Sequence, residues 1–260
     1  MPESMTTSQE PLDYATVCFV IMPFGTKQVG DQSTLTLLRL GLMLRDQGEM
    51  KEALAQFDAA VAKEGRYSEA WREKGIAENK QSRKPGWSGP DGEASLRRAI
   101  GLNPEDFDAL ASLGGVLRRQ KRHDEAFAMY KEAVRVSSGH PYPLLMALKL
   151  GARATGRLDI DGETRRHLLA AQRVRNNQAK LMPPFDSPWC FFDSAEIRLY
   201  LGDLGGFLDW IRQGLEQCEH RWQAETFRSA LQLLADGGVR PDGLERGLSE
   251  LDAGMAGLPD

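Results

Sequence analysis

Apolar residues recur at steps of three and four from about Ser33 to the end of the chain. This spacing lines apolar side chains along one face of an α-helix. Two such stretches fill residues 34–67 and meet at Gly48 and Glu49, where a glycine can end a helix in a left-handed conformation. The pattern predicts an all-α fold of about twelve helices in six antiparallel pairs.

One pattern of four positions occurs three times: a glycine, a small residue, a large apolar residue and an alanine. The copies are Gly41, Ala53, Phe57 and Ala60; Gly75, Gly92, Leu96 and Ala99; and Gly114, Ala126, Tyr130 and Ala133. A period near 34 residues is typical of a stacked helical solenoid. We expect three repeats over residues 33–140. Gly41 and Ala53 would let the two helices of a hairpin approach, Gly114 would face Ala126, and Phe57 would fill the space between hairpins.

The second copy carries an insertion at residues 82–92 with a loop composition that cannot continue a helix. Trp87 stands at its centre. Two interpretations remain open for this side chain: it folds back over the end of the hairpin, or it contacts a partner protein, because an exposed tryptophan is frequent at binding hot spots.

The repeat pattern decays after His140, whereas the helical spacing continues. We expect helices at about 163–179, 189–201, 204–218 and 222–235, and a last one from Pro241. Residues 141–260 are therefore predicted to form degenerate helical pairs that extend the solenoid, with a single continuous core of nearest-neighbour contacts.

Residues 1–32 differ from the rest of the chain. Residues 15–22 form a run of β-forming side chains without polar alternation, as in a strand buried on both faces. Only a short segment separates this run from the first repeat, so no sheet follows it. We expect an extended N-terminal arm with one vestigial strand, which pairs with another chain, packs along its own chain or stays disordered. Pairing would make a homo-oligomer.

Composition narrows the classes of function. A net charge of −4 and a pI near 5.7 disfavour a nucleic-acid partner. No apolar run is long enough to span a membrane, and the N-terminus does not resemble a secretory signal. Cys18, Cys190 and Cys218 are odd in number and fit reduced thiols in the cytoplasm. No ligand spacing indicates a metal site, and we expect no cofactor.

The glycine–alanine–aromatic pattern resembles the tetratricopeptide repeat (TPR). A narrower resemblance, carried by residues 18–25, 71–77, 99–115 and 139–145, is to the bacterial members of the MAP3K TRAFs-binding family. That resemblance implies a scaffold in a signalling or defence-type system. The family also implies a TIR-like or nucleotide-binding-like α/β domain, which we expect to be missing after the first strand, at Gly25. Any catalysis by that domain cannot be transferred to this chain.

The resemblance to TPR proteins implies that the first helix of each pair lines a concave groove. The residues expected there are Arg39, Leu42, Arg45, Arg72, Asn79, Lys80, Arg118, Arg119, Tyr142, Lys149 and Arg153. This set is basic, so it predicts an acidic peptide or a C-terminal carboxylate as ligand. Leu38 and Leu42 disfavour a chaperone-type carboxylate clamp.

The sequence thus predicts a non-catalytic protein-interaction scaffold. For catalysis, Asp186, Asp193, Glu196 and His220 are isolated residues, best explained as helix caps and surface charges, and no catalytic motif is present. Two alternatives remain: a self-assembling regulatory subunit, and the remnant of a nucleotide-processing TIR-like enzyme.

Overall fold

The structure, a computed structural model, describes residues 32–259. All regular elements of these residues are helices, which confirms the predicted fold class. They are α2 (Gln32–Asp46), α3 (Met50–Lys63), α4 (Ser68–Gln81), α5 (Glu93–Leu102), α6 (Phe107–Arg119), α7 (His123–Ser137), α8 (Pro141–Thr155), α9 (Gly162–Ala179), α10 (Trp189–Leu201), α11 (Leu204–Glu216), α12 (Arg221–Asp236) and α13 (Leu244–Met255). The predicted strand at 15–22 lies outside the described residues. None of the described helices is long and apolar enough to cross a membrane.

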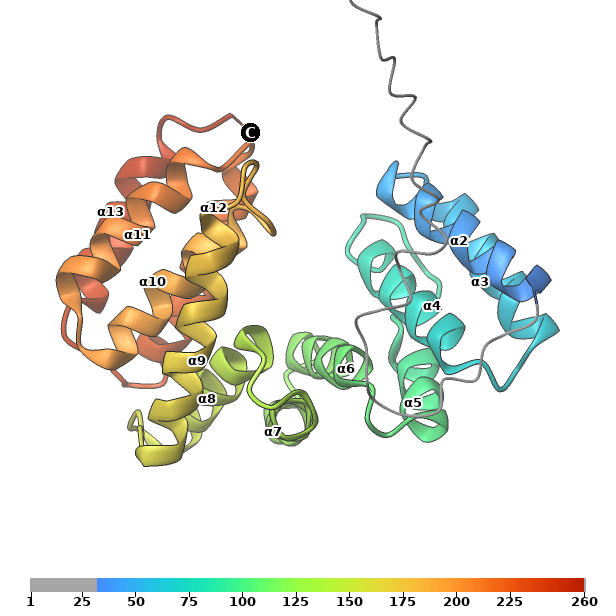
Figure 1. The fold of residues 1–260 in the computed structure, drawn as a ribbon, viewed down its shortest axis with the longest axis horizontal. Helices are drawn as coiled ribbons and strands as arrows, with labels where there is room; N and C mark the ends of the chain where they lie inside the picture. The colour runs from blue at the N-terminus through green and yellow to red at the C-terminus, as the bar shows by residue number, and fades with distance from the viewer. Residues whose placement is uncertain (1–31, 260) are drawn as a thin grey trace, which may run out of the picture.

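The helices form a curved stack with two arms (Figure 1). Helices α2 to α5 make one arm, α9 to α13 make the other, and α6 to α8 join them. The pairs α2/α3, α4/α5 and α6/α7 are hairpins that stack in chain order. Helices α4 and α6 lie on the inner side of the curve, and α5 and α7 lie on the outer side. This is the arrangement of an α-α superhelix.

In each of these hairpins, a glycine of the first helix packs directly against a large side chain of the second helix. A β-carbon added at Gly41 would lie 2.5 Å from Phe57 Cε1, and one at Gly114 would lie 2.9 Å from Tyr130 Cζ. Gly75 and Leu96 form the same contact at 2.6 Å. The atoms nearest to Gly114 belong to Tyr130, where Ala126 was expected. Phe57 contacts Gly41 within its hairpin and shares a core cluster with Ala70 and Ala77 of the next hairpin, in line with the expectation that it fills space between hairpins. The large side chain is what the glycine accommodates.

The insertion in the second repeat is a loop closed upon itself. Trp87 is half-buried, packs against core residues of α2 to α4 and donates a hydrogen bond from Nε1 to the carbonyl oxygen of Pro90 at 3.0 Å. Gly92, with φ +95°, ends the loop so close to α4 that an added β-carbon would lie 2.3 Å from the Gly75 carbonyl oxygen. These contacts favour the first interpretation of Trp87, a side chain folded back over the hairpin.

The core is divided into three clusters, and the expectation of one continuous core was wrong. One cluster lies within α2 to α4, one extends from α5 to α8, and the largest extends from α8 to the C-terminal helices. Trp71 packs against the first two clusters, and Val134 packs against the last two. Beyond α8 the stacking is no longer sequential, because α11 packs on α13 and α12 reaches back to α8.

Candidate functional site

The residues predicted to line the groove all lie on the first helices of their pairs. They are Arg39, Leu42 and Arg45 on α2; Arg72, Asn79 and Lys80 on α4; Arg118 and Arg119 on α6; and Tyr142, Lys149 and Arg153 on α8. The structure places them in three different environments. Arg45 and Arg72 form internal ion pairs, Lys149 and Asn79 are buried, and the other residues lie partly or fully at the surface.

A ladder of alternating charges joins α2, α4 and α6. Arg45 lies 2.5 Å from the carboxylate of Glu73, Arg72 lies 2.9 Å from the other oxygen of Glu73, and Arg72 also reaches Asp106 at 3.0 Å. Because each guanidinium is neutralised by a carboxylate, the fields of these arginines do not add. Arg45 and Arg72 hold neighbouring helices in register, and the expectation that they attract an acidic ligand needs correction.

Lys149 is only 2% exposed, so it does not reach an open groove. Its Nζ lies 2.6 Å from each carboxylate oxygen of Glu196, and the Tyr200 hydroxyl donates to the same carboxylate. Removing one partner of a buried ion pair costs about 3–5 kcal/mol. The assignment of Lys149 to a ligand-binding surface is therefore wrong: this residue fixes α8 to α10.

Tyr142 lies in the first turn of α8 and is 42% exposed. Its hydroxyl lies 3.2 Å from that of the buried Tyr130, and the two rings meet edge to face with centroids 5.9 Å apart. On α2, Arg39 is exposed and Leu42 is half-buried. Tyr142 thus combines a fixed ring with an accessible edge, which suits contact with a ligand.

Five cations at the C-terminal ends of α4, α6 and α8 form what we call the basic strip: Lys80, Arg83, Arg118, Arg119 and Arg153. Burial lowers the pKa of Lys80, and the charges of Arg45 and Arg83 lower it further. Burial together with Arg83 and Arg118 likewise lowers the pKa of Arg119. Burial is the main cause of both shifts, and the neighbouring arginines add to it, while nearby carboxylates act in the opposite direction.

The strip continues from α6 to α8 through His123. Burial, Arg153 and Arg118 lower the pKa of His123. The Nε atom of Arg118 and the Nδ1 atom of His123 are buried and have no hydrogen-bond partner among the described residues. Asn79 accepts a hydrogen bond from Arg119 and positions its guanidinium. Because the Nε atom of Arg118 and the Nδ1 atom of His123 are enclosed by the protein, a ligand at this surface would contact the exposed residues Arg119 and Arg153.

The residues considered for catalysis do not come together in one site, and each of them has a structural role instead. Asp186 and Asp193 bind Arg175 at 2.6 and 2.5 Å, Glu196 binds Lys149, and His220 stands at the N-terminal end of α12. Asp193 and Glu196 are therefore internal ion-pair partners and not surface charges. Within residues 32–259, no group of three histidine, cysteine, aspartate or glutamate side chains is arranged to hold a metal ion.

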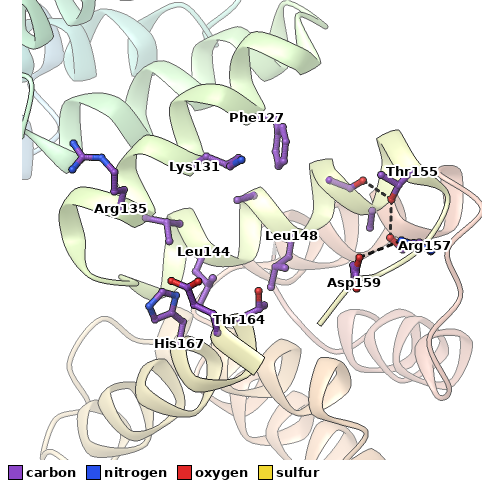
Figure 2. A pocket seen from close by; sticks show the side chains of 15 residues that line it. Phe127, Lys131, Arg135, Leu144, Leu148, Thr155, Arg157, Asp159, Thr164 and His167 are labelled. Carbon is purple, nitrogen blue, oxygen red and sulfur yellow. Dashed lines mark hydrogen bonds and ion pairs between the residues drawn. The ribbon is translucent and has the colours of Figure 1, made fainter. Parts of the chain in front are cut away.

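Sequence reasoning missed an apolar groove of about 460 Å³ between α7, α8 and the start of α9 (Figure 2). Its lining includes Phe127, Val134, Leu144, Leu148 and Gly151, with charged side chains around the rim. A signal was present in the sequence. Residues 144–150 carry apolar side chains on more faces of the helix than one core contact requires.

Residues 38–86 and 90–141 match the family model of the tetratricopeptide repeat. Over helices α2 to α7 the chain is therefore similar to tetratricopeptide repeats. The matched ranges cover the three glycine-centred hairpins and the start of α8, and the gap between them falls in the insertion loop. Tetratricopeptide repeats bind protein or peptide segments, so this part of the chain has the fold of a protein-interaction scaffold. No curated protein matches the chain, and the comparisons do not show the MAP3K TRAFs-binding resemblance.

Solved TPR structures share the fold over most of the chain. A thermophilic TPR protein of Thermus thermophilus is 20% identical, with 76% of this chain and 99% of that chain covered and a TM-score of 0.50. PilF of Pseudomonas aeruginosa is 16% identical, with 87% and 98% covered and a TM-score of 0.52. PilW, a type IV pilus biogenesis factor, is 14% identical, with 86% and 92% covered and a TM-score of 0.51. At these identities the likeness concerns fold alone.

Proposed function

We propose that this protein is a non-catalytic scaffold that binds an acidic segment of a partner protein along the first helices of its repeats, with the basic strip as the main contact. The observation that supports this most directly is the crowding of positive charge around Arg118. The pKa values of His123 and Arg119 are both lowered, first by burial and then by neighbouring cations that include Arg118.

A carboxylate placed between Arg118 and Arg153 would relieve this repulsion. It would also accept hydrogen bonds from the exposed residue Arg153. Charge-assisted hydrogen bonds of this kind are about twice as strong as neutral ones. The ion-pair ladder at Arg45 and Arg72 would keep the helices in register while the strip makes the contacts.

The biological setting of this scaffold is a signalling or defence-type system in the cytoplasm. The setting rests on the resemblance of residues 71–77 and 99–115 to the TRAFs-binding family. Burial also raises the pKa values of Cys190 and Cys218 to about 11, which suits unreactive, reduced thiols.

A peptide array tests the proposal. Twelve-residue peptides graded in aspartate and glutamate content, each with a free or an amidated C-terminus, are probed with the full chain and with the variant R118E/R153E. We expect the full chain to bind the acidic peptides and the variant to lose at least tenfold in affinity at 0.1 M salt. Binding to the full chain should weaken at 1 M salt, because the Debye length falls from about 10 Å to about 3 Å.

The matched control is R166E/R173E, which reverses two exposed arginines of α9, away from the basic strip. This control has the same change in net charge and should bind acidic peptides within about twofold of the original chain, since long-range fields from exposed charges are screened. Equal losses in both double variants would mean that only net charge matters. No loss in either would place the binding surface elsewhere.

A further inference from the structure

The groove between α7, α8 and α9 exists because the regular stacking stops there. In the preceding repeats, the second helix of each pair packs along the first. Helix α9 instead packs mainly on α10 and contacts α8 less extensively. Helices α10 and α12 also contact α8, and the groove lies along the part of α8 beside α7 that these helices and α9 leave uncovered.

The groove has the shape of a site into which a further helix could pack. On α7, Phe127, Lys131 and Val134 follow one another at steps of four and three, so they share one face. On α8, Leu144, Leu148 and Gly151 do the same. Figure 2 shows the two faces side by side, with the apolar groups between them. Two neighbouring helices with a shared apolar channel can receive the ridge of a third helix.

The apolar side chains of this channel are only partly covered. Phe127, Val134, Leu148 and Gly151 are each half-buried, although three of them pack against core clusters. Gly151 keeps the channel open, since a β-carbon there would lie 3.3 Å from the Phe127 ring. A ligand that covers these groups gains the apolar area that the absent helix would have buried.

The charges at the rim indicate the polar part of the ligand. Lys131 stands over the Phe127 ring, with Nζ 5.6 Å from the ring centroid, and has no carboxylate partner among the described residues. Arg135, one turn further along α7, extends the positive edge while pairing with Glu132 at 2.6 Å. On the far side, Asp159 pairs with Arg157 at 3.4 Å. The rim is therefore positive along α7, at Lys131 and Arg135, whereas Glu163 places a negative charge on the opposite edge at the start of α9.

We infer that this groove binds an amphipathic helix of a partner protein, whose apolar stripe fills the channel and whose acidic residues face Lys131 and Arg135. The helix would take the position that α9 leaves open against α8. This site is separate from the basic strip, because none of the strip residues lines the groove. A scaffold with both sites would hold two segments at once.

A phage-displayed library of amphipathic helical peptides, selected on the full-length chain, tests this inference. We expect enriched peptides to carry apolar residues at i, i+3, i+4 and i+7 with aspartate or glutamate on one flank. L148E, which places a charge in the channel, should weaken the selected peptides at least tenfold. K131E should weaken them several-fold and should select against acidic flanks.

The matched controls are L169E and K180E, which make the same changes at exposed positions outside the groove. They should bind within twofold of the original chain, and circular dichroism should show equal helix content in all four variants. Failure to enrich such peptides, or equal binding by L148E and L169E, would overturn the inference. A photo-crosslinker placed at Leu148 in the full chain provides a second readout: crosslinks to residues 1–31 would identify the chain's own N-terminal segment as the occupant and would also overturn it.

Discussion

Gly114 and Gly115 are neighbours on α6 with different surroundings. An added β-carbon at Gly114 would lie within 3.0 Å of three atoms of the fully buried Tyr130 ring. At Gly115, the nearest atoms are the hydroxyl oxygens of Tyr130 and Tyr142, both at 3.7 Å, which is ordinary contact. Only the first glycine is required by packing. The same methyl group can therefore have opposite effects at adjacent positions.

We predict that G114A destabilises the protein by about 1–3 kcal/mol, the usual cost of overpacking a close contact. G115A should be neutral or should stabilise by up to about 1 kcal/mol, because alanine favours a helix over glycine. Urea unfolding of both variants measures the difference. If G114A is as stable as G115A, the hairpin does not close on Gly114 as described.

At the scale of elements, side-chain networks fix one hairpin to the next. Glu93 at the start of α5 accepts hydrogen bonds from Arg122 at 2.8 and 2.9 Å and from Gln120 at 3.0 Å, both beyond the end of α6. Partial burial disfavours the charge of Glu93, but the hydrogen bonds from Gln120, Arg97 and Arg122 outweigh it and lower its pKa to about 2. This carboxylate therefore joins two repeats.

A lowered pKa makes this contact dependent on pH. Its contribution is present above the unfolded pKa of 4.5 and is lost as the pH falls towards 2. We predict that E93Q lowers the free energy of unfolding by about 1 kcal/mol at pH 7, and that the difference shrinks between pH 4.5 and 2. The control E132Q, whose partner Arg135 lies in the same helix, should cost less than about 0.5 kcal/mol. An E93Q effect that is constant with pH would contradict the role of the charge.

The elements themselves were largely predictable from sequence, whereas their partners were not. Helix α10 begins and ends where the apolar spacing predicted, but α13 begins at Leu244 instead of Pro241, because Gly243 has φ +96°. Spacing along the chain also identified the glycines of the repeats. It could not show that Lys149 meets Glu196, because two residues 47 positions apart share no local signal.

On the scale of the whole molecule, the division of the core into three clusters means that each part of the stack depends mainly on its own cluster for stability. Within residues 32–259, the first cluster lies within α2 to α4 and shares only Trp71 with the second. The third cluster gathers residues from α8 to α13. A solenoid with nearest-neighbour contacts transmits damage over short distances only. Local opening should therefore differ between the two arms.

We predict that G41L, which forces bulk against Phe57, accelerates amide hydrogen exchange in α2 to α4 and leaves α10 to α13 unchanged. Hydrogen exchange followed by mass spectrometry of peptic fragments resolves the two regions. Acceleration of the same size in both arms would show that the protein unfolds as one cooperative unit.

The contact between α12 and α8 sets where this fold can change its length during evolution. Duplication of a hairpin among α2 to α7 reproduces existing interfaces, because each hairpin meets only its neighbours in chain order. A hairpin inserted between α8 and α12 would separate two helices that must touch. Relatives with more or fewer repeats should therefore differ on the N-terminal side, while the segment from α8 to α13 is inherited as one block.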